Sequence, residues 1–575
     1  MQYVHNIKQV FLLSFTISLF LLPGVFISVG TCDNAVYKEE FDIILKQLDE
    51  ITEKIEEFED QQGIPDGEES PEETIEMIQD DMDEFIDILD EVEKKSIMDK
   101  LELRAELRTR FDWYDFTGHD TIPFTSEMIG DEKHEKVHAL PTNRFRLNLH
   151  TGVDDWLRFH SRLSMTHIWA DDDSPIYPEK NLINESRIPS DISLKVERAY
   201  VDLFFEPIEN LPIALTFGRL PTTDGFPTNL REDSARKSTY PSMAYDVEAD
   251  GLGVSIDLSQ YTGLKNSAYR LVYIRRCEDH ESYSFSKTLT QKKGIYRSDD
   301  LASSNLEILI SQFETLLPGI FHDTLFLLHF IYIPKTPPQD MRFSDDAYPF
   351  YYDPTGFLFV DKPDSIGTSL KTTCYLESNN FLNLHIDVFL GIAYVKTKAN
   401  DALKFMVDPS VVGLPGPPVQ ARDAYETYKH LLEGSASIPN LVPIFKQLQS
   451  APPAIGLVCN DDHSDRDAYA FHIGGRYQLP FFKTNHPKIG IEYNYGSQYW
   501  LGFSEASEDP LHKLSNRGST WDIYYIQPVN RYLTFRLGFT DMHKDYDHGI
   551  SFYFGEPNAV DHHIQNTYLL MDARF

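Results

Sequence analysis

The sequence predicts an all-β transmembrane antiparallel barrel of about 16 strands, with an N-terminal α-helical, coiled-coil-like extension. Three observations predict this fold class. Residues 101–113 alternate between apolar and charged side chains over a length that suits a membrane-crossing strand. Similar segments follow, and the gaps between them are short and long in turn, as in bacterial barrels. Two heptad runs precede the first strand.

Residues 1–30 indicate a secretory signal peptide. Lys8 supplies the positive charge, residues 10–29 are largely apolar, and Ser28-Val29-Gly30 offers small residues for cleavage. A retained membrane anchor is the alternative. Lipid attachment at Cys32 is disfavoured, because Thr31 is a poor match for the small residue that precedes a lipidated cysteine. Past residue 30 no apolar run reaches about 18 residues, so no transmembrane helix is expected.

Residues 31–100 form an acidic segment with two predicted helices. Between residues 36 and 100 there are 25 Asp and Glu against 6 Lys, in a chain of net charge -38. Apolar residues recur at heptad spacing over 41–58 and again over 75–92, with a break at 62–67. Each apolar stripe needs a partner, either in an antiparallel hairpin or in a bundle with neighbouring subunits. The acidic balance gives no reason to expect nucleic acid as a partner.

The first predicted strand, 101–113, has one largely apolar and one charged face. Successive side chains of a strand point to opposite faces, so Leu103, Leu107 and Trp113 share one face while Glu106 and Arg108 share the other. The strand has thirteen residues, whereas strands of soluble sheets have about 5–6. A half-buried strand of a soluble sandwich is the alternative, and the rest of the chain favours the barrel.

Fifteen further strands are predicted after the first. Seven short turns and eight long loops connect the sixteen strands, so both termini fall on the short-turn, periplasmic side. The stretch 397–466 is predicted to be one long loop. The tryptophans lie near predicted strand ends, as aromatic girdles require, and the last strand ends in Phe575. The predicted strands are 143–153, 156–169, 196–206, 212–220, 250–258, 268–277, 304–316, 322–334, 369–377, 381–396, 467–479, 488–500, 519–527, 531–541 and 566–575.

Seven segments of the chain are distinctive: TNRFRLNLH, WLRFHSRLSMTHIWADD, VERAYVDLFFE, LPIALTFGRLPTTDGFPTNLRE, PSMAYDVEADG, IEYNYGSQYWLGF and TYLLMDARF. They resemble a porin-like bacterial outer-membrane family catalogued as domain of unknown function 3373. The resemblance covers roughly residues 100–575 and is weakest over 278–465. It implies a barrel in the outer membrane of a Gram-negative bacterium and brings no catalytic residues.

Seven arginines share the lumen-facing parity of the first three strands, and we call them the arginine strip. The third long loop, Pro221–Ala249, carries five carboxylates that would face this strip if the loop folded into the barrel, and opposed charges would then set pore selectivity. The alternative is that the arginines form structural pairs along the wall with Glu102, Glu106, Asp202 and Asp572. The strip comprises Arg104, Arg108, Arg110, Arg144, Arg146, Arg158 and Arg162, and the loop carboxylates are Asp224, Glu232, Asp233, Asp246 and Glu248.

No cofactor, metal site or enzymatic activity is expected. The sequence has no P-loop, GxSxG, HExxH or GxGxxG motif, and its four cysteines show no metal-binding spacing. The acidic clusters 171–173 and 461–467 lack the EF-hand pattern and indicate solvated loops. A barrel-embedded enzyme remains an alternative, since such a site is built across strands.

The predicted function is a porin-like outer-membrane channel for passive diffusion of ions or small polar solutes. The alternative is a structural anchor tethered through the helices of 31–100. The expected partners are outer-membrane lipid, the diffusing solutes and, by family analogy, two further copies in a homotrimer. The predicted organisation is a signal peptide at 1–30, a periplasmic helical segment at 31–100 and the barrel at 101–575.

Overall fold

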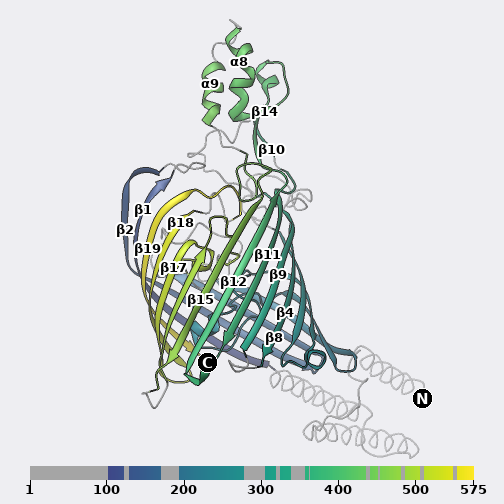
Figure 1. Cartoon of the computed structure of the whole chain (residues 1–575), viewed down its shortest axis with the longest axis vertical. Helices are drawn as coiled ribbons and strands as arrows, with labels where there is room; N and C mark the ends of the chain where they lie inside the picture. The colour runs from purple at the N-terminus through teal and green to yellow at the C-terminus, as the bar shows by residue number, and fades with distance from the viewer. Residues whose placement is uncertain are drawn as a thin grey trace, which may run out of the picture. The chain divides into compact units, whose positions relative to one another are not determined.

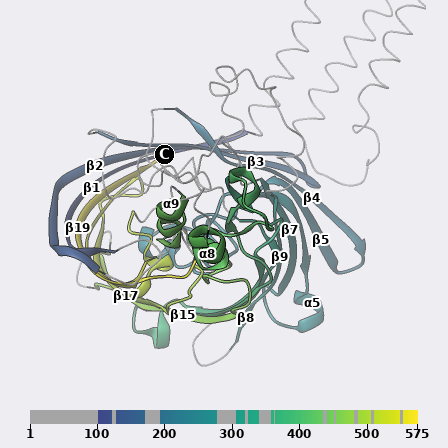
Figure 2. The same cartoon turned by 90° about the horizontal axis from the view of Figure 1, so that it is seen from above.

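The computed structural model describes residues 101–121, 128–169, 193–277, 305–318, 324–338, 357–361, 363–434, 441–450, 454–480, 486–504, 510–547 and 553–575. Within these ranges, sixteen strands form one closed antiparallel barrel (Figures 1 and 2). Neighbouring strands in the barrel are neighbours along the chain, and β1 closes the barrel by pairing with both β2 and β19. The predicted barrel and its strand number are therefore confirmed.

The barrel strands are β1 (Leu101–Thr121), β2 (Met128–Asp154), β3 (Leu157–Ile168), β4 (Lys195–Ile208), β5 (Leu211–Arg219), β6 (Asp250–Asp257), β7 (Ala268–Cys277), β8 (Asn305–Leu317), β9 (Thr324–Thr336), β11 (Gly367–Ser378), β12 (Ile386–Ala399), β15 (Arg466–Gln478), β16 (Lys488–Gly496), β17 (Arg517–Pro528), β18 (Leu533–Tyr546) and β19 (Ala559–Arg574). A small second sheet comprises β10 (Leu358–Asp361), β13 (Lys404–Val407) and β14 (Val419–Gln420). The described α-helices are α4 (Thr228–Glu232), α5 (Ser259–Thr262), α8 (Ala424–Gly434) and α9 (Leu441–Gln447), and the 3-10 helices are η3 (Phe381–Asn383), η4 (Pro409–Val412), η5 (Ala421–Asp423), η6 (Leu448–Ser450) and η7 (Lys513–Ser515).

Most strands lie within a few residues of their predicted positions, and β7 has the predicted bounds. The largest differences are in β1 and β2, which form a much taller hairpin than predicted. Residues 132–136 on β2 are exposed. A strand that meets water on both faces has no apolar side, so the period-two signal disappears there and the extension could not be recognised.

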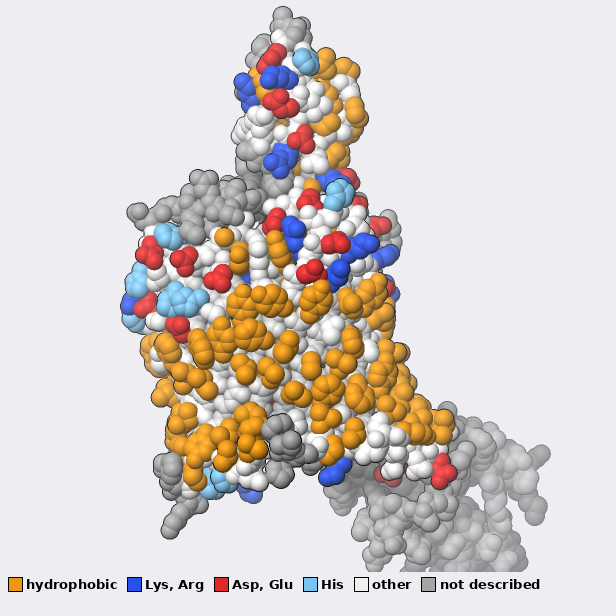
Figure 3. Space-filling model, in the orientation of Figure 1, with side chains coloured by type: hydrophobic (Ala, Val, Ile, Leu, Met, Phe, Trp, Pro, Cys, Tyr) orange, Lys and Arg blue, Asp and Glu red, His pale blue; other side chains and the backbone are white. Residues whose placement is uncertain are grey.

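The barrel is apolar outside and charged inside. On β1, Leu103 and Leu107 are exposed, whereas Arg108 and Arg110 are buried, as the alternation predicts. Figure 3 shows apolar side chains gathered in a broad belt across the face in view, with charged and histidine side chains above it, and exposed apolar residues also occur on strands all along the barrel order. A soluble monomer rarely exposes so large an apolar area. The belt therefore supports a barrel that spans a bilayer, as porin-like barrels do.

Four of the five tryptophans fit the predicted aromatic girdles, and one does not. Trp113, Trp156, Trp169 and Trp521 are exposed on the outside of the described barrel. Trp500 is fully buried beyond the end of β16, where its indole donates a hydrogen bond to the carbonyl oxygen of Leu514 at 2.8 Å. Trp500 is therefore a packing residue of an inward-folded connection and not a girdle residue.

The prediction that 397–466 forms one loop is wrong. Together with β10, the described part of this stretch forms a structured cap, here defined as residues 357–361, 400–434, 441–450 and 454–457, that contains the small sheet and helices α8 and α9 (Figure 1). Tyr428 of α8 and Phe357 both pack against Phe445 of α9. The cap residues belong to the same apolar core as wall residues such as Ile333 and Val395.

The predicted signal peptide, the acidic segment with its heptads, and the acidic cluster 171–173 lie outside the described residues. The chain divides into two units, 1–94 and 95–575, and the second contains the barrel. In the described part of the chain, no helix has the length and apolar character needed to cross a membrane.

Candidate functional site

The loop Pro221–Ala249, here called the inner loop, lies within the barrel. About two thirds of its residues are buried, and only Ala235 and Arg236 are exposed. Phe226 and Leu230 pack against Leu327, Tyr375 and Phe389 on the walls formed by β9, β11 and β12. This apolar contact explains why the loop turns inward, since the same side chains would otherwise be exposed to water. The loop thereby carries its charged residues to the walls.

Asp224 is the contact between the inner loop and the arginine strip. Its carboxylate lies 3.0 Å from the guanidinium of Arg146 on β2 and 2.7 Å from that of Arg162 on β3. Glu197 on β4 also pairs with Arg146, at 3.0 Å. All four side chains are nearly or fully buried. Loop and wall charges therefore form one cluster that joins three neighbouring strands.

Glu232, at the end of α4, makes a second contact with the strip. Its carboxylate lies 2.5 Å from the guanidinium of Arg108 on β1 and 3.0 Å from the amine of Lys237. Arg108 also pairs with Asp572 on β19, at 2.7 Å. Arg108 thus makes both the predicted contact with the loop and the structural wall pair that was the alternative.

The inner loop also reaches strands away from the strip. Asp233 pairs with Arg476 on β15 at 3.0 Å, and it pairs with Lys488 on β16. Arg236 pairs with Glu314 on β8. Because these strands lie far from β1–β4 in the barrel order, the loop spans the lumen and ties its walls together.

Burial and neighbouring charges act in opposite directions on the loop carboxylates. Burial disfavours the ionised form, but Arg146 and Arg162 outweigh it and hold the pKa of Asp224 well below its ordinary value. Burial likewise opposes ionisation of Glu232, yet Arg108 and Lys237 hold its pKa well below the ordinary range. Both carboxylates are therefore charged at neutral pH.

A small polar cavity of about 30 Å³ lies between the inner loop and the wall. A volume of this size has room for about two water molecules. The charges around it balance, because four arginines face four carboxylates. These residues are Arg108, Arg110, Arg231 and Arg536, together with Asp224, Glu232, Asp246 and Asp522.

The other predicted site residues divide between the lumen and the barrel end. Arg110 pairs with Asp112 at 2.7 Å, and Arg144 lies 3.6 Å from Glu106. Arg104 is exposed and pairs with Glu102, whereas the exposed Arg158 stacks on Phe204. Neither of these last two lies in the cluster around the inner loop.

The last two loop carboxylates, Asp246 and Glu248, interact within the inner loop and with the strand that precedes it. Asp246 accepts a hydrogen bond from the backbone N–H of Asp224 at 3.2 Å and lines the cavity. Glu248 pairs with Arg219 on β5. Both side chains are buried.

Several charged residues of the lumen were not predicted. Glu197 and Arg198 on β4 both join the Asp224 cluster. On the opposite wall, Glu492 pairs with Arg231 of the loop at 3.4 Å and with Lys513 at 3.1 Å. The lumen parity of β16 could have indicated Glu492, since it follows the same alternation as the arginine strip.

Three aspartates of the acidic cluster 461–467 pair with other groups of the protein. Asp461 accepts hydrogen bonds from the backbone of His463 and from Ser464, and Asp462 pairs with Lys404 at 3.1 Å. Asp467 accepts a hydrogen bond from Tyr394.

The structure resembles several solved porins at low sequence identity. These include OmpF of Salmonella typhi (10% identity, TM-score 0.37), OprB of Pseudomonas putida (10%, 0.37) and an anion-selective porin from Comamonas acidovorans (8%, 0.38). Each alignment covers 83% of this chain and 97%, 95% and 99% of the respective porin. No curated protein matches the chain.

The family comparison covers most of the barrel. The family model described as "Protein of unknown function (DUF3373)" matches residues 134–308 and 342–573. These ranges include the inner loop, most of the arginine strip and the cap. The match also includes 278–308 and 342–465, parts of the region where the resemblance from the sequence was weakest. The chain belongs to this family, and its described part is a porin-like barrel.

Proposed function

We propose that this protein is an outer-membrane channel for passive diffusion of ions or small polar solutes, narrowed by the inner loop. One observation carries the proposal: within a closed barrel with an apolar outside, the inner loop makes ion pairs with opposite walls of the lumen. Charged groups that line a confined path select solutes by charge. The balanced charges around the cavity favour small polar or charged solutes over apolar ones.

Planar-bilayer recording of the purified full-length protein tests this proposal. Phe226 and Pro241 form a parallel bridge, and parallel segments need a connection of about a dozen residues, so residues 227–240 are best replaced by a glycine–serine linker of equal length, which removes the charged and apolar contacts that this part of the loop makes with the walls. This variant should show a higher single-channel conductance than wild type. An unchanged conductance would mean that the loop does not narrow the path, and absence of any conductance from the wild-type protein would reject the channel.

Charge selectivity gives a second readout. Replacing Arg108, Arg146 and Arg162 together by glutamine leaves Asp224, Glu232 and Glu197 without their main partners. The reversal potential in a salt gradient should then shift toward cations. The matched control replaces Arg104 and Arg158, which belong to the same strip but are exposed away from the loop, and should produce a smaller shift.

The second candidate function is a structural anchor of the outer membrane. The observation that favours it is the bridging of the lumen by the inner loop, which braces the barrel as well as narrowing it. The acidic heptad segment would then provide the periplasmic tether. A barrel that stays silent in bilayers, and whose loss detaches the outer membrane from the cell wall, would favour this function over a channel.

We also propose that residues 1–30 are removed as a signal peptide, that 31–100 lie in the periplasm, and that the barrel forms a homotrimer surrounded by outer-membrane lipid. The heptad runs at 41–58 and 75–92 support the trimer, because neither can bury its apolar stripe alone. Mass measurement in detergent before and after deletion of residues 36–95 tests the trimer. A monomer in both preparations would reject it.

A further inference from the structure

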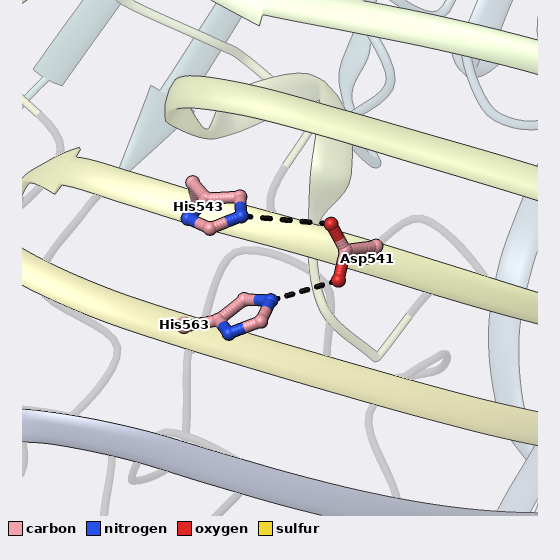
Figure 4. Close-up of side chains that lie close together, drawn as sticks. All are labelled: Asp541, His543 and His563. Atoms are coloured by element: carbon pink, nitrogen blue, oxygen red, sulfur yellow. Dashed lines mark hydrogen bonds and ion pairs between the residues drawn. The ribbon is translucent and has the colours of Figure 1, made fainter.

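Two histidines and an aspartate meet on the outer face of the barrel, on strands β18 and β19. Asp541 and His543 lie two residues apart on β18, so both point to the same side, and His563 stands directly opposite His543 in the ladder. The Nε2 atom of His563 lies 2.7 Å from one oxygen of Asp541, and Nε2 of His543 lies 3.5 Å from the other. Figure 4 shows both rings turned toward this carboxylate.

The donor set is the kind that binds transition metals. The imidazole rings of His543 and His563 stack 4.2 Å apart with an angle of 11° between their planes, and the Nε2 atom of each ring faces the carboxylate of Asp541. One ligand atom from each of the three residues lies within 4.8 Å of the others. Zinc holds its ligands at about 2.0–2.2 Å, which places neighbouring ligand atoms about 3.3 Å apart. Binding a shared ion therefore requires the exposed ring of His543 to rotate out of the stack, so that its Nε2 atom converges with the other two ligand atoms.

The surroundings hold the donors in place. The amide of Gln565 donates a hydrogen bond to Asp541 at 3.0 Å, which is the role that outer residues play in orienting a ligating carboxylate. The donors stand on two paired strands of a closed barrel, and strand positions are held more rigidly than loop positions. His543 and His563 also remain partly accessible, which leaves a route for an ion to enter.

The cluster lies at the margin of the apolar belt. Trp521 on β17 stands opposite Asp541 in the ladder and is exposed, as expected of a residue at a membrane interface. Phe539, two residues before Asp541 on the same face of β18, is also exposed and belongs to the apolar outside. The strand then continues away from the belt, so the cluster is reached from water.

We propose that Asp541, His543 and His563 bind a divalent transition-metal ion of the zinc type, with water completing the coordination. Two imidazoles and one carboxylate suit zinc, copper or nickel better than the oxygen-seeking calcium and magnesium. Sequence spacing could not reveal this site, because its ligands come from two strands whose register brings His543 and His563 together. The contact between His134 and Asp115 differs, because Asp115 also pairs with Lys136, which already supplies a positive charge.

Zinc binding to the purified full-length protein, stripped of metal with a chelator, tests the site. Wild type should bind one equivalent that His543→Ala and His563→Ala each weaken by on the order of tenfold or more. The control is His463→Ala, since His463 is exposed beside Asp462 but has Lys404 rather than a second histidine nearby. This variant should bind zinc like wild type. Circular dichroism and heat-dependent gel mobility check that every variant is folded.

Two further measurements distinguish a specifically coordinated metal ion from nonspecific binding of zinc to the protein surface. Cobalt absorption should report coordination by nitrogen and oxygen in wild type and change in Asp541→Asn, which keeps the shape of the side chain but removes its charge. Excess calcium or magnesium should not displace the bound zinc, because both ions prefer oxygen ligands to imidazole. If wild type binds no stoichiometric zinc, or if His543→Ala and His563→Ala bind it as tightly as His463→Ala does, the site does not exist.

Discussion

Asp224 shows how a single residue fixes the inner loop. Its carboxylate lies within 3.4 Å of the guanidiniums of Arg146, Arg162 and Arg198, which come from three adjacent strands. Removing one partner of a buried ion pair leaves the others charged and desolvated, and this costs about 3–5 kcal/mol. The arginines therefore depend on the loop as much as the loop depends on them.

We predict that Asp224→Asn lowers the free energy of unfolding by an amount near that range, measured by denaturant titration in lipid. The control is Glu102→Gln, which breaks the exposed pair with Arg104 and should cost about 0–1 kcal/mol. Equal effects of the two substitutions would show that the Asp224 cluster is hydrated and contributes little.

The response to acid follows from the depressed pKa values of Asp224 and Glu232, whose ordinary values are 3.8 and 4.5. A group whose pKa is lower in the folded state stabilises that state above its unfolded pKa, and this contribution is lost as the pH falls through the folded pKa. We therefore predict that single-channel conductance stays constant from pH 7 to about pH 5 and changes only below about pH 4. If the conductance instead changed near pH 6 in bilayer recordings, groups other than Asp224 and Glu232 would hold the loop in place.

At the scale of single residues, the sequence indicates which strand faces are charged, but it does not identify every ion-pair partner. Strand alternation places Arg108, Arg146 and Arg162 on the lumen side correctly. It fails for Glu197 and Arg198, which are adjacent yet both buried in the lumen cluster. The pairing of β3 with β4 shifts register between Arg162 and Leu163, and such a bulge turns two successive residues to one side. A bulge has no signature in an alternation pattern.

At the scale of elements, the inner loop depends on one close backbone approach. At Gly225, a Cβ atom would lie 1.9 Å from the carbonyl oxygen of Tyr240 and 2.9 Å from the backbone nitrogen of Ser242. These atoms belong to the returning limb of the loop. Glycine is therefore required where the two limbs pass each other, just before the pairing of Phe226 with Pro241.

We predict that Gly225→Ala forces the two limbs apart, loosens the loop and raises both the mean conductance and its fluctuation in bilayers. The control is Gly152→Ala on β2, where an added Cβ meets nothing within 4 Å and should leave the channel unchanged. If Gly225→Ala conducts as wild type does, the limbs can move without affecting the path.

The strands whose positions the sequence predicted well have one apolar face and one polar face. Strands such as β7 and β16 alternate because one face meets lipid and the other the lumen. The cap was missed because its strands β13 and β14 have only four and two residues, too few to show a period. Helix α8 carries buried Tyr425, Tyr428 and Leu432 at helical spacing, yet it lies among prolines and glycines that favoured a loop.

At the scale of the whole molecule, the barrel has two unlike ends. At one end the strands are joined by short connections such as Glu209-Asn210 and the turn containing α5, and the chain both enters the barrel at Leu101 and leaves it at Phe575. At the other end lie the cap and the tall β1–β2 hairpin (Figure 1). In bacterial barrels the short turns face the periplasm and the long connections face outward.

This asymmetry predicts the orientation of the molecule in the cell. A cysteine at Lys429 on α8 of the cap, where the side chain is 42% exposed, should react with a membrane-impermeant maleimide on intact cells. A cysteine at Gln260, exposed on α5 in the short connection between β6 and β7, should react only after the outer membrane is permeabilised. The wild-type protein, labelled in parallel, measures the background from its native cysteines, of which Cys459 is buried. Labelling of Gln260→Cys but not Lys429→Cys on intact cells would invert the topology. The cap would then face the periplasm, and the metal site at the margin of the belt would lie on the periplasmic side as well.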